Sequence, residues 1–250
     1  MPERALVLGA GGARGFAHMG VLYALERSGI RPDMVIGCSI GALIGALYAL
    51  RGSFAEAESV LREMGKWPDP LNRERIEGYL SEYFGNTLIE EMALGFACVS
   101  ADISRPGASL LAHTAREVVF KAGPLWPAVR ASIGTPIIFP AFRYHGMKLV
   151  DGGILDPVPA WTAKEMGAER IISVEIAGPR TPGGFIRRGV FAQWGYRIHK
   201  AKKRARAVSD VYVRILLPYR SLDFSKGEEI AIAGYRAFAG ALERFIYRLL

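Results

Sequence analysis

The chain has few cysteines and histidines, and this scarcity excludes several kinds of site. Its 250 residues include two cysteines, Cys38 and Cys98, and four histidines. Two cysteines are too few for a disulfide scaffold. There is also no CxxC pair and no HExxH sequence, so we expect no metal site.

Long hydrophobic runs are missing as well. The longest stretch without a charged residue, 34–50, has 17 residues, which is at the short edge of what spans a bilayer. Glycines interrupt it, so we interpret it as a buried strand followed by a buried helix. The first residues, MPERALVLGAGG, lead straight into glycines and do not form a signal peptide. We therefore expect a soluble protein, located in the cytoplasm or at the inner membrane surface.

Positive charge is concentrated in one segment. The net charge is +8, and residues 187–206 contain eight Lys or Arg residues and no acid. One interpretation is a solvated basic face. Another is peripheral contact with an anionic membrane, because Val190, Phe191, Trp194 and Ile198 fall near one helical face. Nucleic acid is the third and last-ranked ligand, since no nucleic-acid motif is present.

Apolar patterning predicts an α/β fold. The order strand, helix, strand, helix in the first 50 residues indicates parallel strands with crossover helices. No linker divides the chain, so we expect one domain over residues 1–250. Apolar runs predict strands at 5–9, 34–37, 96–103, 117–120, 170–176 and 210–218. Helices are predicted at 15–29, 39–50, 54–66, 73–84, 128–133, 159–167 and at the C-terminus. A hairpin is expected at 142–153.

A serine stands at one of these strand-to-helix junctions. Residues 36–45 read IGCSIGALIG, which places Ser39 in the pattern Gly37-x-Ser39-x-Gly41. This is the arrangement of a nucleophile elbow, where flanking glycines leave room for a strained backbone. The start of the following helix also favours negative charge there. The alternative is a small residue in a tightly packed core.

A glycine-rich loop, GAGGARG at 9–15, follows the first strand. Its backbone N–H groups are suited to hold an oxyanion. A dinucleotide-binding loop is the rival interpretation. The third glycine of that fingerprint is missing, and so is the acid expected about 20 residues further on.

The general base is not an obvious histidine. None of His18, His113, His145 and His199 has a motif around it. Asp151 instead follows an apolar strand and precedes two glycines, a placement that can direct a carboxylate into a site. Burial raises the pKa of such a carboxyl, which makes it a better base. An Asp that only caps a turn is the alternative.

Three motifs occur in a characteristic order: Gly-Gly-x-Arg-Gly at 11–15, Gly-x-Ser-x-Gly at 37–41 and Asp-Gly-Gly at 151–153. Together they resemble the patatin-like phospholipase family, most of all its small bacterial members. Residues 130–142 are also similar to the family's segment of small residues and prolines before the aspartate. The resemblance spans about residues 5–176.

The resemblance implies a three-layer α/β/α fold with a mostly parallel central sheet, and a Ser–Asp dyad without histidine. Ser39 would be the nucleophile and Asp151 the base. The oxyanion hole would be formed by the backbone amides of four successive residues, Gly11, Gly12, Ala13 and Arg14. Five glycines would support these motifs: Gly15, Gly37, Gly41, Gly152 and Gly153.

Two residues depart from the family's pattern. Ala10 replaces the first glycine of a common form of the loop motif. Asp156 stands where the family often has Asn, which places a second carboxylate near the site and would shift the pKa of Asp151.

The implied activity is that of a serine lipid acyl hydrolase, which cleaves carboxylic esters of lipids through an acyl-serine intermediate and needs no cofactor. Two alternatives stay open. One is a non-catalytic lipid-binding or regulatory protein. The other is an ordinary α/β-hydrolase, in which Asp151 or Asp156 orients His199.

Overall fold

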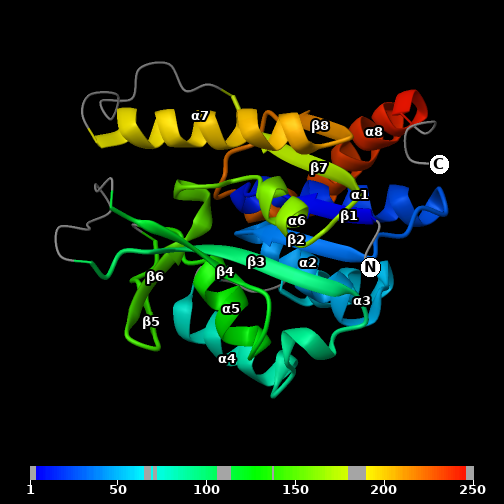
Figure 1. Ribbon diagram of the computed structural model, residues 1–250. Coiled ribbons are helices and arrows are strands. Elements are labelled where there is room, and N and C mark those ends of the chain that lie inside the picture. The colour runs from blue at the N-terminus through cyan, green and yellow to red at the C-terminus, as the bar shows by residue number, and fades with distance from the viewer. Residues whose placement is uncertain are drawn as a thin grey trace.

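A computed structural model describes residues 4–64, 69, 72–105, 114–136, 138–179 and 190–245 (Figure 1). Its centre is an eight-stranded sheet with the order β5-β6-β3-β2-β1-β7-β8, and β4 pairs with β3 off this path. The strands are β1 Arg4–Leu8, β2 Met34–Cys38, β3 Gly95–Asp102, β4 Arg116–Phe120, β5 Phe142–Tyr144, β6 Met147–Asp151, β7 Arg170–Ala177 and β8 Val211–Leu216.

Helices connect most of these strands. They are α1 Ala17–Arg27, α2 Ile40–Arg51, α3 Phe54–Met64, α4 Arg73–Phe84, α5 Leu125–Ser132, α6 Ala160–Glu165, α7 Val190–Val208 and α8 Gly227–Phe245. Short 3-10 helices span η1 Gly12–Phe16, η2 Ile89–Glu91, η3 Gly152–Ile154 and η5 Phe224–Lys226. The predicted strands and helices are confirmed, with ends that differ by a few residues.

The sheet is mostly parallel, as predicted. The pairs β1–β2, β1–β7, β2–β3 and β7–β8 are parallel, whereas β4, β5 and β6 join antiparallel. Parallel neighbours require crossovers, and the helices that make them cover both faces of the sheet. The expected three-layer α/β/α fold is therefore confirmed.

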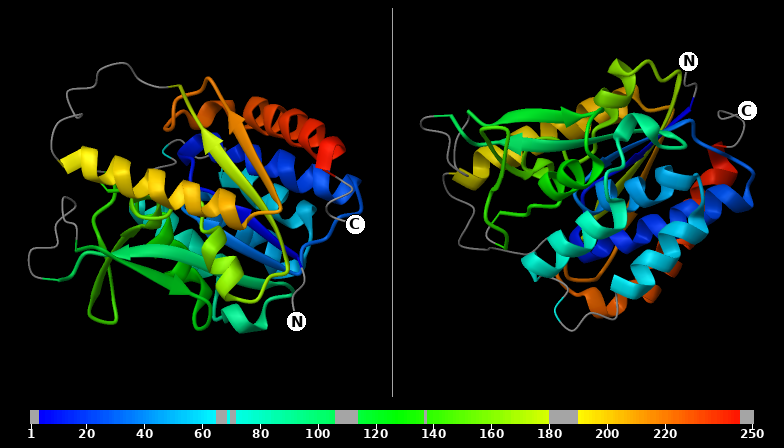
Figure 2. Two further views of the ribbon diagram at one scale, coloured as in Figure 1. Left: turned by 45° about the horizontal axis from the view of Figure 1, so that its top comes forward. Right: turned by 90° about the horizontal axis from the view of Figure 1, so that it is seen from below.

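Alternate residues of β1 show how the two faces are packed. Leu6 and Leu8 contribute to the larger core cluster, together with residues of α1, α2 and α8. Ala5 and Val7 contribute to the smaller one, together with residues of α6 and α7. In Figures 1 and 2, α6 and α7 accordingly lie on one side of the sheet, and α1 and α2 on the other.

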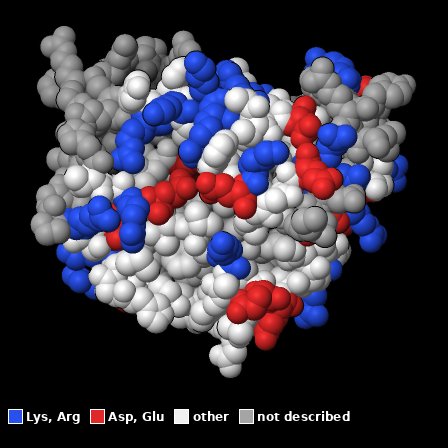
Figure 3. Space-filling view, viewed as in Figure 1, with Lys and Arg blue, Asp and Glu red and all other residues white. Residues whose placement is uncertain are grey.

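The basic segment forms most of α7. In Figure 3, which has the viewpoint of Figure 1, Lys and Arg side chains gather on the upper part of the molecule, where α7 lies. Residues 187–189 and the side chains of Val190, Phe191 and Trp194 lie outside the described residues, so the predicted apolar stripe is visible only at Ile198, which is half-buried. Within the part of the chain that the structure describes, no helix is long and apolar enough to cross a membrane.

Candidate active site

Ser39 occupies a sharp turn between β2 and α2. Its backbone has φ 56° and ψ −128°, and among the described residues only one other non-glycine residue, His145, has a positive φ. Such a conformation is strained for a residue with a Cβ atom, and strain of this kind concentrates at functional sites. The turn lifts the Ser39 side chain out of the strand, as in a nucleophile elbow.

The flanking glycines are required by close packing. A Cβ atom at Gly37 would lie 2.4 Å from the Ala42 Cα, and one at Gly41 would lie 2.2 Å from the Leu8 carbonyl oxygen. Both contacts are with backbone, which cannot move aside cheaply. The elbow therefore depends on glycine at both positions because α2 packs directly against β1 and β2.

Ser39 is hydrogen-bonded to Asp151. The serine Oγ donates to Asp151 Oδ2 at 2.6 Å, and both residues are buried. Asp151 is the last residue of β6, where it pairs with Ser100 of β3. Two residues 112 positions apart are thus brought together because β3 links β2, which ends beside Ser39, to β6.

The environment of Asp151 makes it a stronger base than a free aspartate. Burial raises the pKa of this carboxyl above its ordinary value of 3.8, although hydrogen bonds from Ser39, Gly153 and Thr135 oppose the shift. The Gly153 N–H donates to Oδ1 at 2.8 Å, and the Thr135 hydroxyl donates to Oδ2 at 3.0 Å. These bonds fix the orientation of the carboxylate, and its desolvation favours proton uptake.

Ser132 and Thr135 are two site residues that sequence reasoning did not single out. Ser132 Oγ accepts the Ser39 N–H at 3.0 Å and donates to the Val99 carbonyl at 2.7 Å, so it holds the strained turn in place. Thr135 contacts the carboxylate itself. Both lie in segment 130–142, where the resemblance was the one signal that pointed to them.

The loop predicted to hold the oxyanion lies beside the elbow. Gly15 packs so closely on α2 that a Cβ atom there would be 2.0 Å from the Ile40 Cγ2. The Ala13 N–H donates to the Ser221 carbonyl at 2.8 Å, so this amide is already used within the chain, contrary to the prediction. The amides of Gly11 and Gly12 precede the first turn of η1 and stay candidate donors, whereas the predicted donor Arg14 lies inside this 3-10 helix, where amides bond within the helix.

The Arg14 side chain folds back on its own loop. Its Nε donates to the Gly11 carbonyl at 3.4 Å. The guanidinium also packs on Gly178, where a Cβ atom would lie 1.3 Å from Arg14 Nη1. These contacts tie the backbone of the loop to the end of β7.

Among the described residues, no histidine is hydrogen-bonded to Ser39 or Asp151. His18 is buried on α1, where its Nε2 is 2.7 Å from the Gly9 carbonyl oxygen and burial lowers its pKa to about 4. His145 forms the tip of the β5–β6 hairpin, and His199 is exposed on α7. His113 lies outside the described residues. The described histidines thus supply no partner for Ser39, and the bond that the Ser39 hydroxyl makes is to Asp151.

Asp156, the second carboxylate, faces α7. It is 2% exposed, and its Oδ2 lies 3.5 Å from Arg204 Nη2. Burial, reinforced by the charge of Glu117, raises the pKa of Asp156 to about 7. Its ionisation at neutral pH therefore depends on the neighbouring guanidinium.

An apolar groove of about 610 Å³ lies between α1, α3 and α8. Aromatic side chains of Phe16, Tyr23, Phe54 and Tyr235 line it. Neither Ser39 nor Asp151 lines this groove.

The fold and the site define a class of protein: a three-layer α/β/α protein with a buried Ser–Asp pair at a nucleophile elbow. Comparison with protein families agrees with this description, because the profile of the patatin-like phospholipases matches residues 6–164. The chain belongs to the patatin-like phospholipase family.

Similar proteins include two fungal lysophospholipases and a bacterial relative. The chain is 30% identical to lysophospholipase NTE1 of Phaeosphaeria nodorum over 95% of its own length and 18% of that protein. It is 34% identical to lysophospholipase nte1 of Emericella nidulans, over 72% of its own length and 12% of the length of that protein. An uncharacterised NTE family protein of Mycobacterium tuberculosis is 34% identical to this chain. The match covers 77% of this chain and 54% of the length of that protein. The chain thus spans less than a fifth of the length of these fungal relatives.

Among solved structures, VipD from Legionella pneumophila has a similar fold. It superposes with a TM-score of 0.57 at 11% identity, over 98% of this chain and 67% of VipD. At this identity the similarity concerns the fold alone.

Proposed function

We propose that this chain is a serine hydrolase that cleaves the carboxylic ester of a monoacyl lipid through Ser39 and Asp151. The observation that carries the proposal is the 2.6 Å hydrogen bond between Ser39 Oγ and Asp151 Oδ2 at a strained strand-to-helix turn. A serine hydroxyl becomes a useful nucleophile only when a base within hydrogen-bond reach can take its proton.

In the first half of the reaction, Ser39 Oγ attacks the ester carbonyl carbon while its proton passes to Asp151. The negative charge that develops on the carbonyl oxygen would be held by the amides of Gly11 and Gly12, which precede the first turn of η1. The ester C–O bond then breaks, and the departing alkoxide takes the proton back from Asp151. The products of this step are an alcohol and an acyl-serine.

In the second half, water takes the place of the alcohol. Asp151 accepts a proton from the water, whose oxygen attacks the acyl-serine carbonyl. When the tetrahedral intermediate collapses, the bond to Ser39 Oγ breaks and the serine regains its proton. A carboxylic acid is released, and the dyad returns to its starting state.

The substrate class rests on the relatives. Those that share 30–34% identity with this chain include proteins named lysophospholipases, which favours a lipid with one acyl chain. Because the chain covers a small part of those proteins, the substrate belongs to the proposal.

The test combines chemical labelling with turnover. A fluorophosphonate should label Ser39, as identified by mass spectrometry, and Ser39→Ala should abolish both labelling and hydrolysis of lysophosphatidylcholine. Asp151→Asn should abolish hydrolysis, whereas His199→Ala should leave most of it. Loss of activity in a folded His199→Ala protein would favour the triad instead. Binding of lysophospholipid without any hydrolysis, including of short aryl esters, would indicate a lipid-binding protein.

A further inference from the structure

One short segment, 151–158, connects both halves of the catalytic machinery. It begins with Asp151, whose Oδ1 accepts the Gly153 N–H at 2.8 Å. Near its other end, the Pro157 carbonyl accepts the N–H of Ala10, the residue before the oxyanion loop, at 2.8 Å. The position of this segment therefore affects the base and the loop together.

Asp156 lies in the middle of this segment and holds it from within. Its N–H donates to the Gly152 carbonyl at 2.9 Å, and its Oδ1 accepts the Val158 N–H at 3.2 Å. The side chain is 2% exposed, so a charge on it requires a nearby cation. Glu117 of β4 makes this environment more negative still, because its charge helps to raise the pKa of Asp156.

Arg204 of α7 supplies that cation. Its Nη2 lies 3.5 Å from Asp156 Oδ2, and its guanidinium carbon is 5.2 Å from the centre of the Trp161 ring. Trp161 belongs to α6, which follows the segment directly. Ala201 and Ala205 pack α7 against the protein on either side of this contact, so the helix presents Arg204 from a fixed position.

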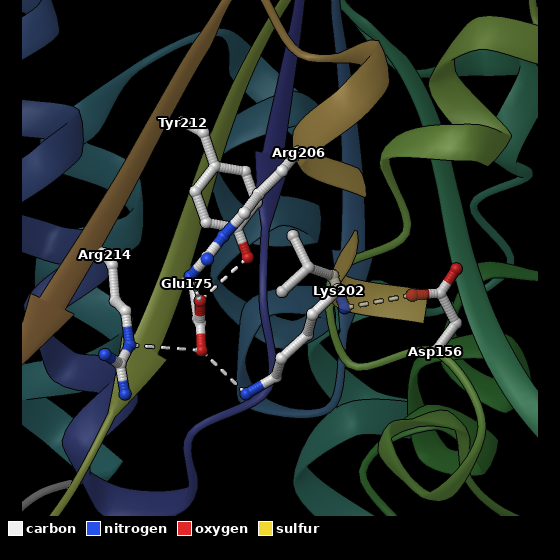
Figure 4. A network of polar contacts seen from close by, with 7 residues as sticks. Asp156, Glu175, Lys202, Arg206, Tyr212 and Arg214 are labelled. Atoms are coloured by element: carbon white, nitrogen blue, oxygen red, sulfur yellow. Dashed lines mark hydrogen bonds and ion pairs between the residues drawn. The ribbon is translucent and has the colours of Figure 1, made fainter. Parts of the chain in front are cut away.

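Glu175 of β7 differs from Asp156 in the number of its ion-pair partners. This carboxylate, also buried, lies within ion-pair distance of Lys202, Arg206 and Arg214 and accepts the Tyr212 hydroxyl (Figure 4). It can lose one partner and keep three. Asp156, by comparison, has a single ion-pair partner in the described part of the chain.

We propose that Arg204 is a positioning residue for catalysis, which acts through Asp156 to hold segment 151–158 in the place that both the Asp151 carboxylate and the oxyanion loop require. This rests on the proposed function. Without Arg204, Asp156 becomes an unpaired buried acid and takes up a proton, and the segment loses the contact that fixes it to α7. Small displacements of this kind slow chemistry by as much as about 100-fold.

The test compares Arg204→Met with a closely matched control, Arg206→Met. Both changes remove a half-exposed arginine from α7, together with an ion pair to a buried carboxylate and a stacking contact with an aromatic ring. They differ in the acid that is affected. With a soluble ester, we expect kcat to fall about tenfold in Arg204→Met with little change in KM, and to stay near wild type in Arg206→Met.

A double-mutant cycle separates positioning from general damage. Asp156→Asn removes the buried charge and keeps the shape of the side chain, so the ion pair between Asp156 and Arg204 is already lost, although Glu117 still lies near Arg204. Adding Arg204→Met to Asp156→Asn should therefore cost almost nothing further. Equal, independent losses in the two backgrounds would overturn the proposal, as would wild-type kcat in a folded Arg204→Met protein.

Hydrogen exchange gives a readout that does not depend on catalysis. The amides of Ala10 and Gly153 are bonded to Pro157 and Asp151. Peptides that contain them should exchange faster in Arg204→Met than in wild type, and not in Arg206→Met. If wild type hydrolyses no ester, the proposed function fails and exchange alone decides the positioning role. Unchanged exchange in Arg204→Met contradicts that role in either case.

Discussion

At the scale of single residues, the site is defined by how Asp151 is held. Ser39, Gly153 and Thr135 all donate hydrogen bonds to its carboxylate, and these bonds favour the ionised form while burial opposes it. The pKa of Asp151 is thus the result of two opposing effects. Removing one of these hydrogen-bond donors should therefore raise the pKa of Asp151.

We expect Thr135→Val to lower hydrolysis and to move its pH dependence. The substitution removes the hydroxyl that donates to Asp151 Oδ2 at 3.0 Å, so the pKa of Asp151 rises further above 3.8. A base must be ionised to act, so the acid limb of kcat/KM moves to higher pH. At the foot of this limb the loss should be about tenfold, the cost of one hydrogen bond to a charged group, and it should shrink at higher pH.

Thr135→Ser is the matched control because it keeps the hydroxyl. In this variant the acid limb of the pH profile of kcat/KM should stay at the wild-type pH. A pH profile of kcat/KM that is identical in Thr135→Val and wild type would show that this contact does not tune the base.

Among the elements, α2 and α7 carry the clearest structural demands. Helix α2 must approach β1 closely enough that Gly41 contacts the Leu8 carbonyl. Some of the Lys and Arg side chains of helix α7 form ion pairs with buried acids, whereas others face solvent.

Gly41→Ala should destabilise the fold by about 1–3 kcal/mol, since the added methyl group would overlap backbone atoms 2.2 Å away. Gly78→Ala is the control. Gly78 lies on the exposed side of α4 with nothing within 4 Å of an added Cβ atom, so alanine there should stabilise the protein by up to about 1 kcal/mol. Urea unfolding of both variants tests the difference, and the same sign for both would contradict the close-packing argument.

The exposed cations of α7 decide whether this helix contacts a membrane. We propose that Lys200 and Lys203, both exposed, attract anionic lipid. Reversing both to Glu should weaken sedimentation with vesicles of phosphatidylserine and slow hydrolysis of vesicle lipid, while a soluble ester is cleaved at the wild-type rate.

Lys202 and Arg204 are unsuitable for this test because they pair with Glu175 and Asp156, and reversing them would disturb the fold. If the Lys200→Glu, Lys203→Glu protein matches wild type in every assay, the basic run is only a solvated face. Loss of salt-sensitive retention on RNA or DNA would instead favour nucleic acid.

At the scale of the whole molecule, the buried Asp151 makes the free energy of unfolding depend on pH. Burial raises the pKa of Asp151 above its ordinary 3.8, so the folded chain holds this proton more tightly than the unfolded chain does. The contribution of Asp151 to the free energy of unfolding is therefore lost as pH rises from about 4 through the raised pKa of the folded state. Asn at this position cannot ionise and keeps a similar shape.

Asp151→Asn should therefore be inactive yet more stable than wild type at pH 8, by about 1 kcal/mol. The advantage should diminish as pH falls towards 4, because wild type then becomes protonated as well. Thermal unfolding at several pH values measures it. An advantage that grows as pH falls would contradict the sign of the pKa shift.

The sequence by itself determined the elements and the family. Apolar runs and their spacing depend on neighbours along the chain, so they predicted the strands, the helices and the hairpin at 142–153. The order of three short motifs indicated the family and named Ser39 and Asp151. Each of these inferences uses local pattern, which is present in the sequence before any folding.

Only the tertiary structure decided which groups meet. Thr135 and Ser132 join the site because β3 and α5 bring them there, and the Ala13 amide is used by Ser221, which lies more than 200 residues further along the chain. The basic run of α7 likewise divides into paired and exposed cations according to which buried acids lie beneath it. Hydrogen bonds and ion pairs depend on distances of a few ångströms between remote segments, and spacing along the chain does not encode those distances.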